Sequence, residues 1–246
     1  MWLRGELKAR AKNVLGWNYW KAFLVSLVIS LAVGGGGGGG STNWRENSGN
    51  NYTPFENGDL GAIGILTLAL VAAGVLFFFV LLALRVFIGY PLEVGGRKYF
   101  VQSAQNYDNR RCFRFAFDGQ NYLGIITTML VKSIQNFLWY LLLFVPGVVK
   151  LYFYSMVPYI LADNPNIGIR KAIRLSRNMT YGHKFRMFVL DLSFLGWYLL
   201  GLLALVVGML FVKPYDDATK AELYLVLRRN ALERNMCSYE DLAQGN

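Results

Sequence analysis

The sequence predicts an all-α membrane protein, a polytopic bundle of about six transmembrane helices arranged as three hairpins with basic amphipathic interfacial helices. The first observation is the stretch Leu60–Leu84, which contains no charged residue, whereas a helix needs about 20 apolar residues to cross a hydrocarbon core of about 30 Å. The second is a composition of 54% hydrophobic and 16% charged residues, against about 25% charged in soluble domains. The third is a net charge of +10, carried by cations beside apolar runs, as in cytoplasmic loops.

This clustering of cations also bears on the expected partners. A strongly basic chain is typical of proteins that bind nucleic acid or an anionic membrane surface. Because the cations flank apolar segments, we expect the lipid bilayer and its anionic headgroups at the cytoplasmic face as partners, and no nucleic acid. The whole chain, residues 1–246, is expected to form a single membrane domain.

The N-terminal part combines a basic segment with a first apolar run. Residues 1–16 predict a basic amphipathic helix in the headgroup layer, rather than a solvated helix. Trp17, Tyr19 and Trp20 follow as an aromatic belt. Ala22–Val33 could be the core of a secretory signal peptide, but the long basic segment before it and the absence of an Ala-x-Ala site favour an uncleaved first span.

The next segments alternate between the two sides of the membrane. Residues 34–59 are rich in Gly and Asn and predict a flexible extracytoplasmic loop. Leu60–Phe87 is the second span, and residues 88–120 form a basic cytoplasmic loop with one short helix at Leu92–Ala104.

Two further spans surround a strong turn signal. Asn121–Val145 is the third span, Pro146-Gly147 predicts an external turn, and Val148–Ala162 returns as the fourth span. Residues 163–185 carry many cations and predict a second cytoplasmic loop with a basic helix.

The last apolar segment leaves the number of spans open between five and six. Hydropathy counts Met187–Val212 as one span, which would place the C-terminus outside. The basic tail, residues 228–246, belongs inside by the positive-inside rule. Six spans resolve this conflict, with Phe185–Leu203 leading out and Val206–Leu227 returning.

A weak internal repeat also favours three hairpins. A glycine, one or two polar residues and an aromatic residue precede three of the outward spans, at residues 16–19, 119–122 and 182–185, and each returning helix carries a proline at its exit (Pro91, Pro158 and Pro214). Chance similarity among apolar stretches is the alternative.

The third span has a polar face. Thr128, Lys132, Gln135 and Asn136 recur at three- and four-residue steps, so they line one side of a helix. A charge near mid-depth, as expected for Lys132, costs about 2.5–3.5 kcal/mol and requires a partner or water. Asp191 is the counter-charge that the sequence suggests. The cluster predicts either a polar cavity or ion pathway, or an internal salt bridge that joins helices, and we favour the salt bridge.

The sequence gives little support for catalysis or metal binding. Asp216 and Asp217 are adjacent and so point about 100° apart on a helix, which is poor geometry for paired acid–base catalysis. His183 is expected to be an interfacial hydrogen-bonding residue rather than a general base. No GxSxG motif is present, and no cluster of Cys and His has metal-ligand spacing. We therefore expect no enzyme, no cofactor and no metal.

Several motifs resemble a known family. The matching segments are residues 18–23, 90–95, 155–165, 182–184 and 192–197, and Pro214-Tyr215 with Thr219 and Ala221. As a set they are similar to a bacterial integral-membrane family catalogued as domain of unknown function 975. The resemblance implies a bacterial plasma-membrane protein of about six helices. It also singles out motif residues of unknown role: Pro91, Glu93, Pro158, Asp163, Asn164, Pro165, Gly182, His183, Pro214 and Tyr215.

These observations lead to two functional hypotheses. The first is a non-enzymatic plasma-membrane protein that acts by binding a protein, peptide or lipid partner, with both termini in the cytoplasm. The alternative is a small transporter or channel with a polar intramembrane cavity around Lys132 and Asp191.

Overall fold

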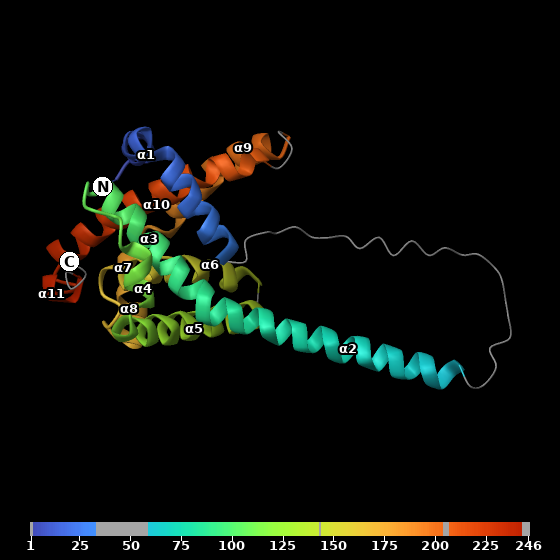
Figure 1. Cartoon of the computed structure of the whole chain (residues 1–246). Coiled ribbons are helices and arrows are strands. Elements are labelled where there is room, and N and C mark those ends of the chain that lie inside the picture. Colours follow the sequence, from blue (N-terminus) through green and yellow to red (C-terminus); the bar gives the residue numbers. More distant parts are fainter. Residues whose placement is uncertain (1, 33–58, 143, 204–206, 243–246) are drawn as a thin grey trace.

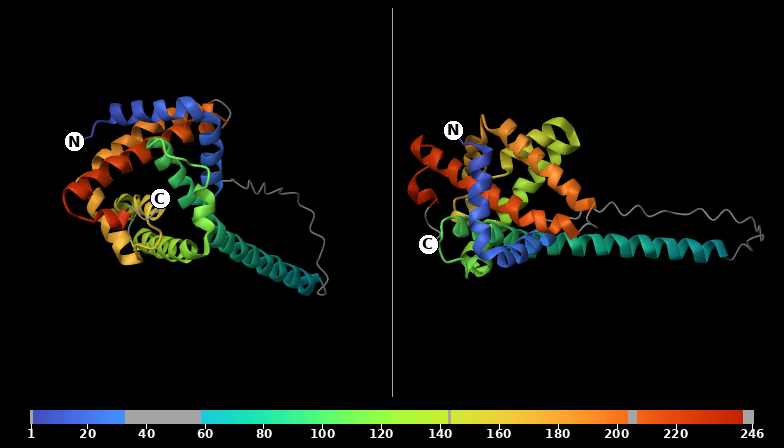
Figure 2. Two further views of the ribbon diagram at one scale, coloured as in Figure 1. Left: turned by 60° about the vertical axis from the view of Figure 1, so that its left-hand side comes forward. Right: turned by 90° about the horizontal axis from the view of Figure 1, so that it is seen from above.

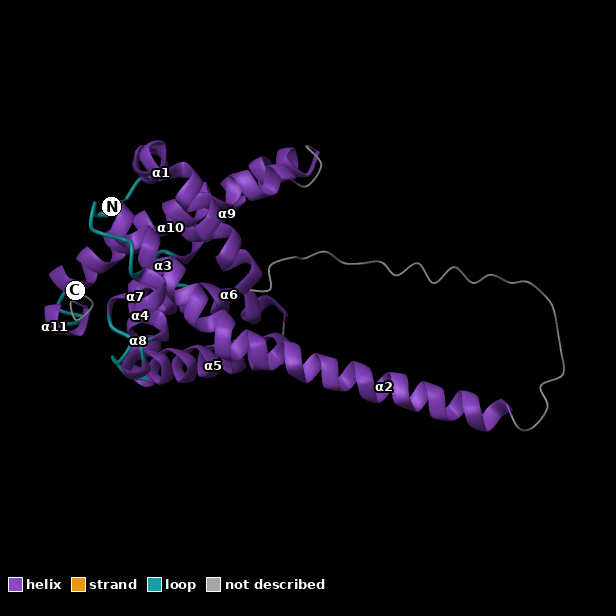
Figure 3. Cartoon of the chain, viewed as in Figure 1, coloured by secondary structure: helices purple, strands orange, loops and turns teal. Residues whose placement is uncertain are grey.

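The computed structural model describes residues 2–32, 59–142, 144–203 and 207–242. Within these ranges the chain forms helices and turns and no β-strand, which confirms the all-α fold class (Figure 3). The predicted Gly/Asn-rich loop lies outside the described residues, except for Asp59. The helices, labelled in Figure 1, are α1 (Arg4–Ala32), α2 (Asp59–Leu84), the π-helical turn η1 (Arg85–Gly89), α3 (Tyr90–Ala104), α4 (Cys112–Phe117), α5 (Gly119–Leu142), α6 (Phe144–Tyr154), α7 (Val157–Asp163), α8 (Ile169–Thr180), α9 (Lys184–Leu203), α10 (Val207–Glu233) and α11 (Tyr239–Leu242).

Three of these helices are long and apolar enough to cross a membrane. They are Ile65–Ala104, Gly119–Leu142 and Lys184–Leu202, and a shorter apolar stretch runs from Tyr19 to Ser30 in α1. Length and composition therefore agree with membrane association for part of the predicted bundle.

The N-terminal segment and the first apolar run form one helix, α1, which changes direction along its length (Figure 2). Leu7, Ala11 and Leu15 are buried, and α1 packs closely against α10. The apolar side of the predicted interfacial helix is therefore covered by protein, while Arg4, Arg10 and other cations remain exposed.

The predicted break between the second span and its cytoplasmic loop is absent. α2, η1 and α3 run on as one continuous rod. Pro91 lies inside this rod, in the first turn of α3, and its missing N–H leaves the carbonyl four residues earlier, that of Phe87, without a helical donor. This carbonyl instead accepts a hydrogen bond from the Tyr122 hydroxyl at 2.8 Å. The residues of α2 from Ile65 onward are exposed, and α2 stands clear of the other helices (Figure 1).

The two helices that follow α5 also differ from the expectation. α6 already begins at Phe144, so Pro146-Gly147 is not the turn but lies in the first turn of a helix, where proline is tolerated. The predicted fourth span is broken at Ser155-Met156, between α6 and α7. Pro158 lies in the first turn of α7 and cannot supply the N–H that a continuous helix would need there.

Glycines allow the closest approach between α9 and α10. A Cβ added at Gly201 would lie 2.8 Å from the Gly208 carbonyl carbon, and one added at Gly208 would lie 2.6 Å from the Gly201 Cα. Small residues at such crossings let two membrane helices pack backbone to backbone.

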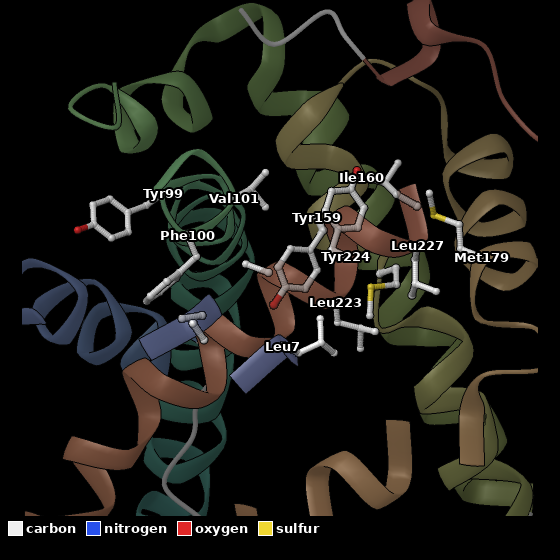
Figure 4. Packing of buried hydrophobic residues seen from close by; sticks show 14 of the residues in the cluster. Leu7, Tyr99, Phe100, Val101, Tyr159, Ile160, Met179, Leu223, Tyr224 and Leu227 are labelled. Atoms are coloured by element: carbon white, nitrogen blue, oxygen red, sulfur yellow. The ribbon is translucent and has the colours of Figure 1, made fainter. Parts of the chain in front are cut away.

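The main hydrophobic core joins the first, middle and last parts of the chain. It includes Leu7 of α1, Phe100 of α3 and Tyr224 of α10, all at most 1% exposed. Tyr159 and Tyr224 stack in its centre, with ring centroids 5.3 Å apart (Figure 4). This core fixes α3, α7 and α10 around the polar residues described next.

Candidate functional site

A cavity of about 350 Å³ lies among η1, α3, α5, α6, α7, α9 and α10. It receives side chains from helices that are far apart in the sequence. Its charged lining residues are Arg85, Glu93, Arg97, Lys132, Asp191 and Lys220.

The charged lining contains four cations and two carboxylates. Each carboxylate already has a cationic partner. Glu93 lies 3.8 Å from the Arg85 guanidinium, and Asp191 lies 3.2 Å from the Lys220 ammonium. The cavity wall is therefore cationic.

An ion-pair network behind this wall fixes Arg97. Its Nη1 donates to Asp217 Oδ1 at 2.7 Å and to the Tyr159 hydroxyl at 3.2 Å. Asp217, whose side chain is fully buried, also accepts a hydrogen bond from Ser26 at 2.9 Å and lies 3.2 Å from the Lys213 ammonium. The network thus joins α1, α3, α7 and α10.

Lys220 is fixed in a similar way by two carboxylates. Its ammonium lies 3.0 Å from Asp216 and 3.2 Å from Asp191. The Tyr152 hydroxyl donates to Asp191 at 2.9 Å and the Tyr198 hydroxyl donates to Asp216 at 3.2 Å. These contacts engage both carboxylate oxygens of Asp191, Oδ1 with Lys220 and Oδ2 with Tyr152.

Lys132 is the cation of the wall that this network does not engage. No carboxylate of the described residues forms an ion pair with it. One turn further along α5, Asn136 also lines the cavity, and its Oδ1 is buried without a hydrogen-bond partner among the described residues. Together they offer an ammonium and an amide group to a molecule in the cavity.

The break between α6 and α7 faces the same space. Ser155 and Met156, the turn residues, line the cavity. The carbonyl of Phe153, which a continuous helix would have used internally, accepts a hydrogen bond from Ser176 of α8 at 2.7 Å. Interrupted helices at membrane depth occur where they are buried in protein or line a water-filled cavity.

The predicted polar cluster is only partly brought together. Lys132, Asn136 and Asp191 meet at the cavity, whereas Thr128 and Gln135 do not line it. Thr128 is 1% exposed. The expected Lys132–Asp191 pair is wrong, because Asp191 is held by Lys220 from α10.

Among the motif residues, Glu93 and Pro158 line the cavity. Asp163, at the end of α7, instead accepts a hydrogen bond from the Tyr224 hydroxyl at 2.6 Å and lies 3.2 Å from the Arg228 guanidinium. Burial raises the pKa of Asp163 to about 6, against the opposite effects of Arg228 and Tyr224. This motif residue therefore ties α7 to α10.

The neighbouring motif residues hold the chain after α7. Asn164 donates to the Asp241 carbonyl of α11 at 3.2 Å. The Pro165 carbonyl lies so close to α5 that a Cβ at Gly124 would be 2.5 Å away. We assign a positioning role to both.

The remaining motif residues lie away from the cavity. Gly182 has φ of +79°, and His183, before α9, has a buried Nδ1 without a hydrogen-bond partner among the described residues. Burial lowers the pKa of His183, and nearby Arg186 adds to this effect. Pro91 and Pro214 lie in α3 and α10, and Tyr215 packs edge-on against Phe194.

Sequence reasoning missed Arg97, Lys220 and Asp217 as site residues. Arg97 counted only as a loop cation, because local composition cannot distinguish a loop from a continuing helix. A signal was present in Asp216, Asp217 and Lys220, since charges inside a predicted span need partners from another helix.

In the part of the chain that the structure describes, no group of three or more His, Cys, Asp or Glu side chains could hold a metal ion. Comparison with curated proteins and with solved structures gave no match. Residues 142–231 match the model of a family described as "Protein of unknown function (DUF975)". This match, which runs from the end of α5 through most of α10, confirms the resemblance read from the sequence motifs.

Proposed function

We propose that this chain is a polytopic membrane protein that binds a small anionic solute in the cavity and acts by binding rather than by catalysis. The observation that carries the proposal is Lys132, a cation on the cavity wall without a carboxylate partner among the described residues. Asn136 beside it also lines the cavity, and the N–H groups of its side-chain amide would be the donors to the anion.

The charge of the cavity favours an anion over a cation. Its two carboxylates are engaged by Arg85 and Lys220, so an anion would supply the missing partner of Lys132. An unpaired charge at membrane depth costs about 2.5–3.5 kcal/mol, and a bound carboxylate or phosphate would offset this cost. A cavity of about 350 Å³ lies at the small end of ligand sites, about 300–1,000 Å³, which suits a metabolite rather than a peptide.

For the topology, we propose six crossings of a bacterial plasma membrane, with both termini in the cytoplasm. In Figure 1 the end of α9 and the starts of α2, α6 and α10 lie towards one side, and both chain termini lie towards the other. α8 lies on the terminal side (Figure 1), and it carries the exposed cations Arg170, Lys171, Arg174 and Arg177, which the positive-inside rule assigns to a cytoplasmic face. Anionic headgroups are the partners that we propose for this face.

Transport of the bound anion is a second candidate function. The helix break at Ser155-Met156, on the cavity wall, favours it, because many transporters bind substrates beside discontinuous helices. Binding alone and transport then differ in one measurement, the flux of the anion across a sealed membrane.

The binding proposal can be tested by calorimetry on protein purified in nanodiscs, with inorganic phosphate and succinate as anionic probes and putrescine as a cationic probe. We expect an anion to bind, and Lys132→Gln to lower its affinity at least about tenfold, since a hydrogen bond to a charged group contributes about 1.5–3 kcal/mol. Lys150→Gln is the matched control, because Lys150 lies over the Trp139 ring and does not line the cavity. Equal affinities for the two variants would refute the proposal.

Transport can be tested in proteoliposomes loaded with the anion that binds. Flux that disappears in Lys132→Gln and persists in Lys150→Gln would support the transporter. Saturable binding with no flux above that of empty liposomes would leave the binding function alone.

A further inference from the structure

A second hollow lies on the side of the molecule where the chain termini are, and we call it the Arg10 groove. It is an open groove of about 560 Å³ between α1, the end of α3, α10 and α11. Its charged lining residues are Arg10, Glu222, Arg228 and Arg229. None of its lining residues lines the cavity described above.

Glu222 is the unusual residue of this groove. Glu222 is only 6% exposed, yet no described group donates a hydrogen bond to its carboxylate or forms an ion pair with it. A buried carboxylate without such a partner is costly. A cationic hydrogen-bond donor that entered the groove would remove this cost.

The opposite charge lies on the groove's rim. Arg10 and Arg229 are exposed, and neither forms an ion pair with a carboxylate of the described residues. Arg228 is not available, because its two terminal nitrogens bind Asp163 and the Leu242 carbonyl. Arg10 attracts Glu222 electrostatically without forming an ion pair with it, so the groove presents a buried carboxylate and two guanidinium groups that have no ion-pair partner among the described residues.

The rest of the wall is apolar. Val14 of α1 and Leu225, Val226 and Leu232 of α10 line the groove. Glu222 lies five residues before Leu227, the predicted cytoplasmic end of the last span, a rise of about 7–8 Å. On the proposed six-span topology the groove therefore lies within reach of lipid rather than in bulk water.

We infer that the Arg10 groove binds the headgroup of an aminophospholipid. The primary ammonium would donate to the Glu222 carboxylate, the phosphate would lie between Arg10 and Arg229, and an acyl chain would cover the apolar wall. A zwitterion with both charges satisfies both sides of the groove, whereas an anionic lipid would leave Glu222 without a partner.

The test uses the purified full-length protein and native mass spectrometry with lipids of identical acyl chains. We expect phosphatidylethanolamine to be retained at least about tenfold more than phosphatidylcholine, whose quaternary ammonium has no N–H to donate. Equal retention of the two lipids would overturn the inference.

Variants separate the two ends of the headgroup. Glu222→Gln should abolish the preference for phosphatidylethanolamine over phosphatidylglycerol, and Arg229→Gln should weaken the binding of both. Glu6→Gln is the matched control, since Glu6 is an exposed residue of α1 outside the groove. A preference in Glu222→Gln equal to that of Glu6→Gln would contradict the inference. If Glu222→Gln does not fold, the comparison of lipids on the unaltered protein decides.

A competition experiment distinguishes the lipid from its free headgroup. Soluble phosphoethanolamine should displace the lipid only at concentrations at least about tenfold higher than those of the lipid. Displacement at equal concentrations would mean that the apolar wall contributes nothing and that the occupant is a soluble zwitterion rather than a lipid.

Discussion

Replacement of Asp217 by asparagine tests the ion-pair network that joins three distant parts of the chain. The side chain of Asp217 is fully buried. It contacts Ser26, Arg97 and Lys213 at 2.9, 2.7 and 3.2 Å. Asparagine has nearly the same shape and can still accept from Ser26, so the substitution removes mainly the negative charge.

The expected cost follows from the partners that remain. The side chain of Arg97 is 12% exposed and cannot recover its interaction from water, whereas Lys213 is 26% exposed and can turn towards solvent or headgroups. Removal of one partner from a buried pair costs about 3–5 kcal/mol. We expect Asp217→Asn to lower the free energy of unfolding by this amount, mostly through Arg97.

The assay is equilibrium unfolding by SDS in mixed micelles, followed by circular dichroism. Asp108→Asn is the control, since Asp108 and Arg110 form a pair at 3.9 Å with side chains that are 75% and 89% exposed, and such pairs contribute less than about 1 kcal/mol. If both variants lose the same stability, the reasoning about the buried network is wrong.

Three further predictions concern Gly182, Gly201 and Asp163. Gly182→Ala should lower the free energy of unfolding by about 1–2 kcal/mol, because φ of +79° is unfavourable for a residue with a Cβ. Its control, Gly16→Ala, has no atom within 4 Å of the added Cβ and should raise the free energy of unfolding by about 0.5–1 kcal/mol, since alanine favours a helix over glycine. Gly201→Val should lower the free energy of unfolding by about 1–3 kcal/mol by forcing α9 away from Gly208. The pKa of Asp163, raised by burial to about 6, exceeds its value of about 3.9 in an unfolded chain. The folded state therefore binds the proton more tightly, and stability relative to Asp163→Asn should rise as the pH falls from 7 to 4, by at most about 1.4 kcal/mol per pH unit.

Unfolding in the same micelles checks all three, and each has a contrary outcome. Equal stabilities of Gly182→Ala and Gly16→Ala would remove the backbone argument. A Gly201→Val protein as stable as the unaltered chain would mean that the α9–α10 crossing is not tight. A stability difference between the unaltered protein and Asp163→Asn that is independent of pH, or that changes in the opposite direction, would contradict the burial of Asp163.

The features that depend on local sequence were predicted well. An uncharged run such as Leu60–Leu84 specifies a long helix by itself. The three- and four-residue spacing of Lys132 and Asn136 likewise places both on one side of α5, and both line the cavity. Such periodicities need no knowledge of the partner helices.

The features that depend on tertiary contacts were predicted less well. The partner of Asp191 is Lys220 rather than Lys132, and local sequence does not determine which of two cations a carboxylate will meet. Pro91 predicts the end of a span, but the Phe87 carbonyl that this proline leaves without a helical donor accepts a hydrogen bond from Tyr122 of α5, and α3 continues from η1. Arg97 became part of the site only through this continuity.

Because α2, η1 and α3 form one continuous helix, the thickness of the bilayer around α2 should affect the shape of the cavity. At 1.5 Å per residue the rod is about 70 Å long, more than twice the thickness of the hydrocarbon core. A tilt of α2 would therefore also move α3, which continues from it through η1. Hydrophobic mismatch is relieved partly by tilting a helix. A thinner membrane that tilts α2 would therefore swing Glu93 and Arg97 relative to Lys132, and the width of the site would follow the lipid around it.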